Sequence, residues 1–211
     1  MNDHLAAAST PMTWDRWLMR KDLVMQQADI GEADWPRILL WDVRDQMSVE
    51  VLSDAIQDVW THVNEGLVAL PIEKLPSYDG RTPDRLTPAE WMELFDRVGY
   101  LSYEGESQAA CETPTVLFRY AEHDGEISWA WTVGLEEAAN FEFHFADRVR
   151  PACIWQVSDV DPDRILAHFH STPQEGDVSE DEYVYIPAGS EISHVRAGTN
   201  CPDREATPLS K

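Results

Sequence analysis

The sequence predicts an α+β protein with a helical N-terminal half and a β-sheet core in the C-terminal half. Apolar residues recur at helical spacing over much of residues 1–99. From residue 100 to residue 197 they form short runs separated by Pro, Gly and Asp, which is typical of strands. Residues 198–211 are a polar tail. We therefore expect the region 1–99 to pack on a β core formed by residues 100–197.

The composition limits the kinds of partner. The chain of 211 residues has a formal net charge of -23. Because Lys and Arg drive phosphate binding, no direct nucleic-acid binding is expected, and anionic membranes are disfavoured. A hydrophobic fraction of 43% with Trp 9 is enough for a real core. The acidity favours solubility and also suits a basic partner.

The cysteines and the N-terminus bear on the compartment. Cys111, Cys153 and Cys201 are widely spaced and include no Cys-x-x-Cys, so neither a disulfide framework nor a zinc site is indicated. Residues 1–10 lack the charged start and apolar core of a signal peptide, and no apolar run approaches the length of a membrane span. We expect reduced thiols and a cytoplasmic protein.

Three helices are predicted before residue 70. The first covers Met12–Ala28, after Pro11 at a helix start. A short second helix begins near Pro36. Ser48 caps the third, whose apolar positions share one face. These positions are Val49, Leu52, Ile56, Val59 and Val63.

A fourth helix has the clearest local signal in the chain. Thr87 and Glu90 have the spacing of a capping box, with Pro88 in the first turn. Gly99 suits the left-handed position that ends a helix. The buried stripe is predicted to be Trp91, Leu94, Phe95 and Val98.

The second half is predicted to hold one helix among strands. The helix spans Leu135–Arg148, with Ala138, Phe141 and Phe145 facing inward, and Leu101–Thr113 is predicted to be a loop. The expected strands are Thr115–Tyr120, Ile127–Thr132, Pro151–Val157, Ile165–Phe169, Tyr183–Ile186 and Ile192–Val195.

Three pieces of this half combine polar and apolar residues in an order of interest. Arg119 lies in the apolar run Leu117–Tyr120, and Ser128 opens the aromatic-rich run Ser128–Thr132. The acidic triplet Glu180–Glu182 precedes another apolar run. Each has an ordinary explanation alone: a strand-edge Arg, a core strand and a solvated turn. Their order along the chain is more informative about function than any one of them alone.

In this order the pieces resemble the Arg–Ser–Glu signature of mono-ADP-ribosyltransferases, and most closely that of small bacterial and phage members. Two positions depart from the family pattern, since Tyr120 stands where Gly is usual and Ala130 where a second hydroxyl is usual. The matching segments are Phe118-Arg119-Tyr120, Ser128-Trp129-Ala130, Leu135–Ala146, Ala152–Val157, Val160–Ala167 and Glu180–Pro187.

The resemblance implies a split β-sheet core of ADP-ribosyltransferase type, with NAD as substrate in a cleft between its strands. Glu182 would stabilise the positive charge that develops on the ribose, as in glycoside cleavage. Glu180 would orient or deprotonate the acceptor. Side chains alternate along a strand, so these two carboxylates would share a face while Asp181 points the other way. The spacing is associated in the family with a protein arginine as acceptor.

The resemblance also implies the cofactor-binding residues. Arg119 would hold the NAD pyrophosphate through bidentate hydrogen bonds. Ser128 would support the glutamate or the ribose. The nicotinamide would be walled by Trp129, Phe141 and Phe145. No metal is required, and the sequence assigns no oligomeric state.

Two other functions are compatible with the sequence. The chain could be a non-enzymatic acidic interaction or inhibitor protein, either a DNA mimic or an inactive binder of ADP-ribosyltransferase fold; NAD binding discriminates between these and the enzyme. It could also be a metal-dependent β-fold enzyme, in which alternating strand histidines bind the ion. The candidate ligands are His168, His170, Glu175 and His194.

Overall fold

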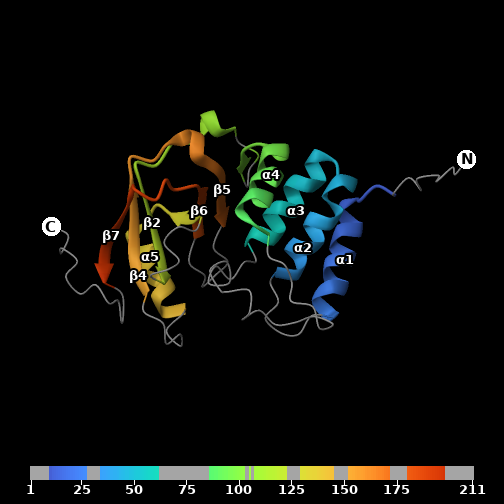
Figure 1. Ribbon diagram of the computed structural model, residues 1–211, viewed down its shortest axis with the longest axis horizontal. Helices are drawn as coiled ribbons and strands as arrows, with labels where there is room; N and C mark the ends of the chain where they lie inside the picture. The colour runs from blue at the N-terminus through green and yellow to red at the C-terminus, as the bar shows by residue number, and fades with distance from the viewer. Residues whose placement is uncertain are drawn as a thin grey trace, which may run out of the picture. The chain divides into compact units, whose positions relative to one another are not determined.

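The computed structural model of the protein describes residues 10–27, 34–61, 86–102, 105, 107–122, 129–144, 152–171 and 180–197. The chain divides into two compact units. One contains Met1–Asn64 and Leu70–Val98, and the other contains Glu65–Ala69 and Gly99–Lys211. The described part of the first is helical, and that of the second is a sheet with one α-helix (Figure 1). The predicted α+β class is confirmed. Within the described ranges, no helix has the length and apolar character needed to cross a membrane.

Val49 of the predicted apolar face is exposed, and Val98 of the predicted buried stripe is only partly buried, but all four predicted helices of the first unit form. They are α1 (Trp14–Gln27), α2 (Asp34–Val43), α3 (Val49–Thr61) and α4 (Pro88–Val98). Trp17 of α1 is fully buried, and its Nε1 donates to an Asp58 carboxylate oxygen at 2.9 Å. Lys21, one turn further along α1, pairs with the same carboxylate at 2.6 Å. Asp58 therefore ties α3 to α1 through two donors.

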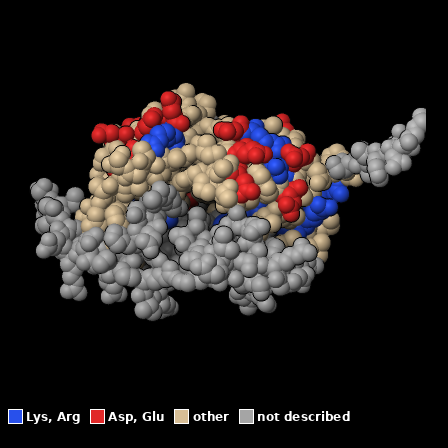
Figure 2. Space-filling view, in the orientation of Figure 1, with Lys and Arg blue, Asp and Glu red and all other residues tan. Residues whose placement is uncertain are grey.

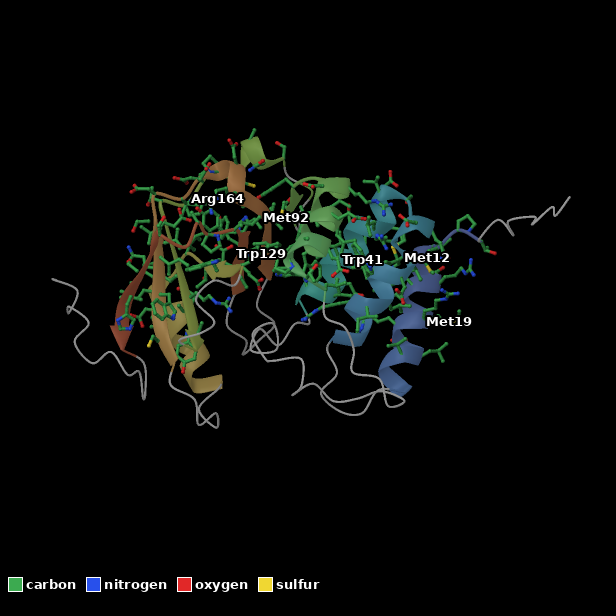
Figure 3. All side chains as sticks on the ribbon, in the orientation of Figure 1. Met12, Met19, Trp41, Met92, Trp129 and Arg164 are labelled. Carbon is green, nitrogen blue, oxygen red and sulfur yellow. The ribbon has the colours of Figure 1, made fainter. Side chains whose placement is uncertain are left out.

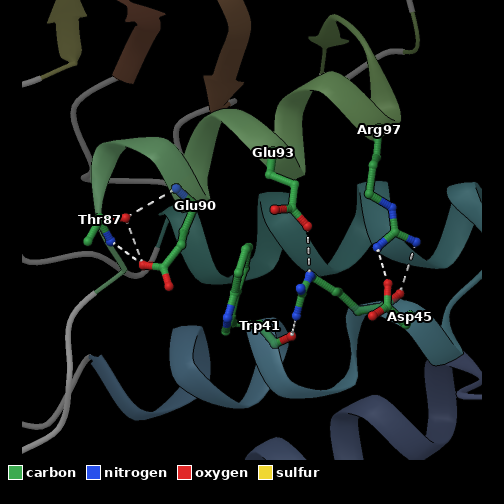
Figure 4. Close-up of polar contacts among 7 residues, drawn as sticks. Trp41, Asp45, Thr87, Glu90, Glu93 and Arg97 are labelled. Atoms are coloured by element: carbon green, nitrogen blue, oxygen red, sulfur yellow. Dashed lines mark hydrogen bonds and ion pairs between the residues drawn. The ribbon is translucent and has the colours of Figure 1, made fainter.

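The capping box of α4 forms as predicted (Figure 4). The Thr87 backbone N–H donates to Glu90 Oε2 at 2.6 Å, and the Glu90 N–H donates to Thr87 Oγ1 at 3.3 Å. Gly99 follows the helix with a φ of 76°, the left-handed conformation in which glycine meets no Cβ clash. The start and the end of α4 are thus both determined by local sequence.

Replacing Thr87 with alanine should lower the free energy of unfolding by about 1 kcal/mol, because the cap oxygen for the Glu90 N–H is lost. Thr87→Ser keeps that oxygen and should lie within a few tenths of a kcal/mol of the native protein. Urea unfolding followed by circular dichroism measures both. Equal losses in the two variants would show that the hydroxyl does not cap the helix.

Aromatic packing joins α4 to α3. The Trp60 ring meets the Trp91 ring edge to face at a centroid distance of 5.0 Å, and the Phe95 ring at 5.7 Å. Two ion pairs lie nearby, Arg44 with Glu93 and Arg97 with Asp45 (Figure 4). Both carboxylates are exposed, so these pairs contribute little. The apolar rings hold the helices together.

The second unit is built on a mixed sheet with the strand order β1-β5-β6-β3-β2-β4-β7. Strands β1 and β5 are parallel, and the other neighbours are antiparallel. All six predicted strands are present. The bounds are β1 Leu101–Ser102, β2 Val116–Glu122, β3 Ala130–Thr132, β4 Ala152–Ser158, β5 Ile165–Ser171, β6 Glu180–Tyr185 and β7 Ile192–Ala197.

Several strand boundaries differ from the sequence predictions by one to three residues, and two differences bear on the site. Strand β1 was expected to be loop, because two residues are too short to show an alternating pattern. The acidic triplet lies inside β6 rather than before it, since this strand starts at Glu180. Glu180 and Glu182 therefore obey the period-two rule within one strand.

The two faces of the sheet pack differently. Ala138 and Ala139 of α5 (Leu135–His144) pack with Ile154, and Phe118 and Tyr120 cover this cluster; we call this the helix face. The other face carries the main core, and we call it the core face. Its buried residues include Leu117, Ala121, Trp131, Cys153, Trp155, Val157, Tyr183 and Tyr185.

One cysteine corrects the sequence analysis. Cys153 is fully buried on β4 and is disulfide-bonded, so the prediction of reduced thiols is wrong at this position. Cys111 is not disulfide-bonded, as expected. Wide spacing in sequence says nothing about distance in the fold, because neighbouring strands bring remote residues together.

Candidate functional site

The sheet is nearly divided between β2 and β3. In the described part of the chain these strands are joined at one residue pair, Phe118 opposite Thr132. By contrast, β2 pairs with β4 along its whole length, from Val116 to Glu122. Within the described residues no further pair of this kind joins the two strands, so their described backbone groups need other partners. We call this place the split.

Arg119 is buried beside the split. Its side chain is on β2, and the residue is 5% exposed. Nη1 of Arg119 donates to the backbone oxygen of Ala130 on β3. A side chain thus satisfies a carbonyl of β3 next to the single described β2–β3 pair. An anionic ligand strongly stabilises a buried guanidinium.

Glu182 belongs to a row of opposite residues that crosses six strands, from Phe169 on β5 to Ser193 on β7. Directly opposite residues share a face of a sheet. Glu182 is opposite Thr132 on one side and Phe169 on the other, and Thr132 is opposite Phe118. Glu182 is the single carboxylate of this row and is partly buried. Glu180 is opposite Ser171, and its side chain lies outside the described residues.

Register places the Cα–Cβ bonds of Arg119 and Glu182 on opposite faces of the sheet. Arg119 alternates with Phe118 and Tyr120 and so leaves β2 on the core face. Glu182 shares the helix face with Thr132 and Phe118. Since the two side chains start on opposite faces, the structure does not bring Arg119 and Glu182 together in one cleft, which the resemblance implied.

The remaining predicted site residues lie around the start of β3 and α5. Trp129 is partly buried directly before β3, and its carbonyl accepts a hydrogen bond from the Tyr185 N–H at 2.7 Å (Figure 3). Ser128 and Phe145 lie outside the described residues, as does the side chain of Phe141. Their roles stay predictions.

Thr132 is a site candidate that the sequence analysis missed. It is 8% exposed, and its hydroxyl has no hydrogen-bond partner among the described residues. An unpaired buried hydroxyl is unfavourable and indicates a ligand or a functional role. It stands directly across from Glu182, whereas Ser128 is four positions earlier. Only the β3–β6 register reveals this, and the sequence does not state that register.

The unpaired hydroxyl gives a stability prediction. Thr132→Val keeps the shape and removes the hydroxyl, so the free energy of unfolding should stay equal or rise by about 1 kcal/mol. Thr132→Ser keeps the hydroxyl, removes a methyl group and should be destabilised by about 1 kcal/mol. Urea unfolding ranks the two. A Thr132→Val variant less stable than Thr132→Ser would mean that the hydroxyl has a structural partner.

Arg164 is a second basic residue of this unit, and a carboxylate holds it (Figure 3). Its Nη1 lies 3.1 Å from Glu191 Oε1, and Tyr185 Oη donates to the same oxygen at 2.9 Å. Burial acts to raise the pKa of Glu191, but the Ala188 N–H, Tyr185 and Arg164 outweigh it and lower that pKa. Arg164 therefore has a structural role in joining β5, β6 and the turn before β7.

The histidines do not assemble a metal site in the described part of the chain. No group of three or more His, Cys, Asp or Glu side chains there is arranged to hold a metal ion. His194 is on β7, at one end of the strand order, and packs against Trp155. His168 and His170 are on β5, near the other end. Glu175 lies outside the described residues.

Comparisons of the chain with protein-family models, with curated proteins and with solved structures found no match. The fold and the site define an α+β protein whose second unit carries a mixed sheet, with Arg119, Thr132 and Glu182 on three successive strands.

Proposed function

We propose that the chain is an NAD-dependent mono-ADP-ribosyltransferase that modifies a macromolecular acceptor, with a protein arginine side chain as the preferred group. One observation carries the proposal. Arg119 and Glu182 lie on the two strands that flank β3, next to the split in the sheet. The Arg–Ser–Glu order that the resemblance implies gives the roles of these residues, although Arg119 and Glu182 leave the sheet on opposite faces.

The proposed reaction breaks the bond between the ribose C1′ atom and the nicotinamide nitrogen. The bonding electron pair leaves with nicotinamide, and C1′ becomes positively charged as in an oxocarbenium ion. Glu182 is partly buried between Thr132 and Phe169, where a carboxylate acts on such a charge more strongly than in water. A nitrogen of the acceptor guanidine then attacks C1′ and loses a proton, with Glu180 as the proposed base.

The other residues are proposed to position NAD. Arg119 holds the pyrophosphate, whose charge suits a buried guanidinium. Trp129, Phe141 and Phe145 wall the nicotinamide. The hydroxyl of Thr132 replaces the second hydroxyl that Ala130 lacks. The Tyr120 ring packs in the cluster under α5, on the face away from the Arg119 side chain.

The hydroxyl of Thr132 should matter for transfer. Thr132→Val should lower the rate of ADP-ribose transfer about tenfold or more, because the proposed polar contact to the ribose is lost. Thr132→Ser should retain most of the rate. Initial rates at saturating NAD measure both. Native rates in Thr132→Val would assign this role to another hydroxyl.

Calorimetric titration with NAD separates the enzyme from the acidic interaction protein. We expect saturable heat with the native protein and also with Glu182→Gln, because the pyrophosphate contacts remain. Figure 2 shows acidic side chains on both units of the visible face rather than in one patch, which gives a DNA mimic little support. No heat with NAD would favour the non-enzymatic function, and capture of a basic protein would then be the next experiment.

A further inference from the structure

The middle residue of the acidic triplet has its own partners on the core face. Asp181 lies between Glu180 and Glu182 in β6, and its side chain points to the opposite face. His168 Nε2 is hydrogen-bonded to Asp181 Oδ1, and His170 Nδ1 lies 3.6 Å from the same oxygen. Two histidines of β5 thus converge on one carboxylate of β6.

His168 is fixed by a second contact. Its ring stacks on the Tyr183 ring, with 4.1 Å between centroids and 14° between the planes. Tyr183 is buried in the main core, two residues after Asp181. The His168 ring therefore has a set position and a set orientation. A donor that is already oriented loses little entropy when it binds a carboxylate, unlike most surface pairs.

Negative charge is concentrated at the start of β6, where Asp181 lies between Glu180 and Glu182. Three successive carboxylates repel one another. The ionisable groups that face Asp181 and Tyr183 are His168, His170, Cys111 and Glu112. The hydrogen bond from His168 lowers the pKa of Asp181, and burial raises the pKa of Tyr183 to about 12. Asp181 is thus ionised and Tyr183 neutral near pH 7; His168 is hydrogen-bonded to the carboxylate, and His170 lies next to it.

We propose that His168 and His170 clamp Asp181 and so fix the start of β6, which positions Glu180 and Glu182 on the helix face. Asp181 and His168 are then positioning residues, which act without touching NAD. The structural part of this proposal concerns β6 alone, and its effect on catalysis rests on the proposed function. The clamp lies where the described part of β6 begins, the end of a strand that frays most easily.

Amide hydrogen exchange on the full chain tests the clamp without any substrate. His168→Phe keeps a ring to stack on Tyr183 and removes the donor, and Asp181→Ala removes the acceptor. In both, exchange of the amides of β6 should speed up about tenfold or more, while the β2 peptide Val116–Glu122 keeps its native rate. His168→Gln keeps an N–H donor and should stay within about threefold of the native rate.

His194→Phe is the matched control, because His194 packs on Trp155 of β4 and should leave β6 unchanged. Native exchange at β6 in His168→Phe and Asp181→Ala would overturn the clamp. Faster exchange across the whole unit would also overturn it, since that means general destabilisation.

Kinetics then test the positioning role. Asp181→Ala and His168→Phe should lower kcat for transfer about tenfold with little change in KM for NAD, and His168→Gln should restore kcat. Faster exchange at β6 with native kcat would leave a structural clamp and overturn the positioning role. If the native protein neither binds NAD nor transfers ADP-ribose, the proposed function fails, while the exchange experiment still decides the clamp.

Discussion

Replacing Glu182 with glutamine is expected to lower ADP-ribose transfer by about a hundredfold or more. Glutamine keeps the size of the side chain and removes the negative charge that opposes the charge on the ribose in the transition state. Glu182 is partly buried opposite Thr132, so water cannot easily replace that charge. The free energy of unfolding should change little, because a partly buried carboxylate is replaced by an amide of equal shape.

The control for this experiment is Glu136→Gln. Glu136 is an exposed glutamate in the first turn of α5, and its replacement should leave transfer unchanged. The matched variant Glu180→Gln should reduce protein modification more than plain NAD hydrolysis, because Glu180 is proposed to act on the acceptor. If Glu182→Gln transfers ADP-ribose at the native rate, Glu182 is not the catalytic carboxylate.

Replacing Trp131 with alanine is expected to lower the free energy of unfolding by about 3–5 kcal/mol. Trp131 is 2% exposed on β3 and belongs to the main core with Leu117 and Tyr183. Strand β3 joins β6 to β2, and a cavity there loosens the whole second unit. A loss of this size is a large part of the stability of an ordinary domain.

Two variants keep that experiment interpretable. Val133→Ala, at the next position, removes an exposed side chain and should change the free energy of unfolding by less than about 0.5 kcal/mol. Trp131→Phe retains part of the apolar volume, so its free energy of unfolding should lie between those of Trp131→Ala and Val133→Ala. It also serves as the measurable variant if Trp131→Ala does not fold. Urea unfolding measures all three. Equal stability of Trp131→Ala and Val133→Ala would contradict the assignment of Trp131 to the core.

Local signals were read correctly from the sequence. The capping box at Thr87 and Glu90 and the stop at Gly99 involve residues close together in the chain, so their spacing is enough to place α4. The strand alternation around Arg119 and around Glu182 was also visible. The α+β class follows from such local patterns, because helices and strands differ in the period of their apolar residues.

Features that depend on pairing between remote segments could not be read in the same way. The residue of β3 that lies opposite Glu182 is Thr132. That pairing depends on the β3–β6 register, which no local sequence pattern gives. The same holds for the disulfide at Cys153, for the strand β1 that pairs with β5, and for the contact of His168 with Asp181. Alternation along the strand makes His168 and His170 possible metal ligands, because it cannot show which residue of the neighbouring strand lies opposite them.

The most direct test of the proposed function is transfer of label from NAD. Purified native protein and Glu182→Gln would each be incubated with labelled NAD and a cell lysate, and labelled proteins analysed by mass spectrometry. We predict ADP-ribose on arginine side chains of a lysate protein with the native chain and a strongly reduced amount with Glu182→Gln. No labelled lysate component, together with no heat on titration with NAD, would contradict the transferase.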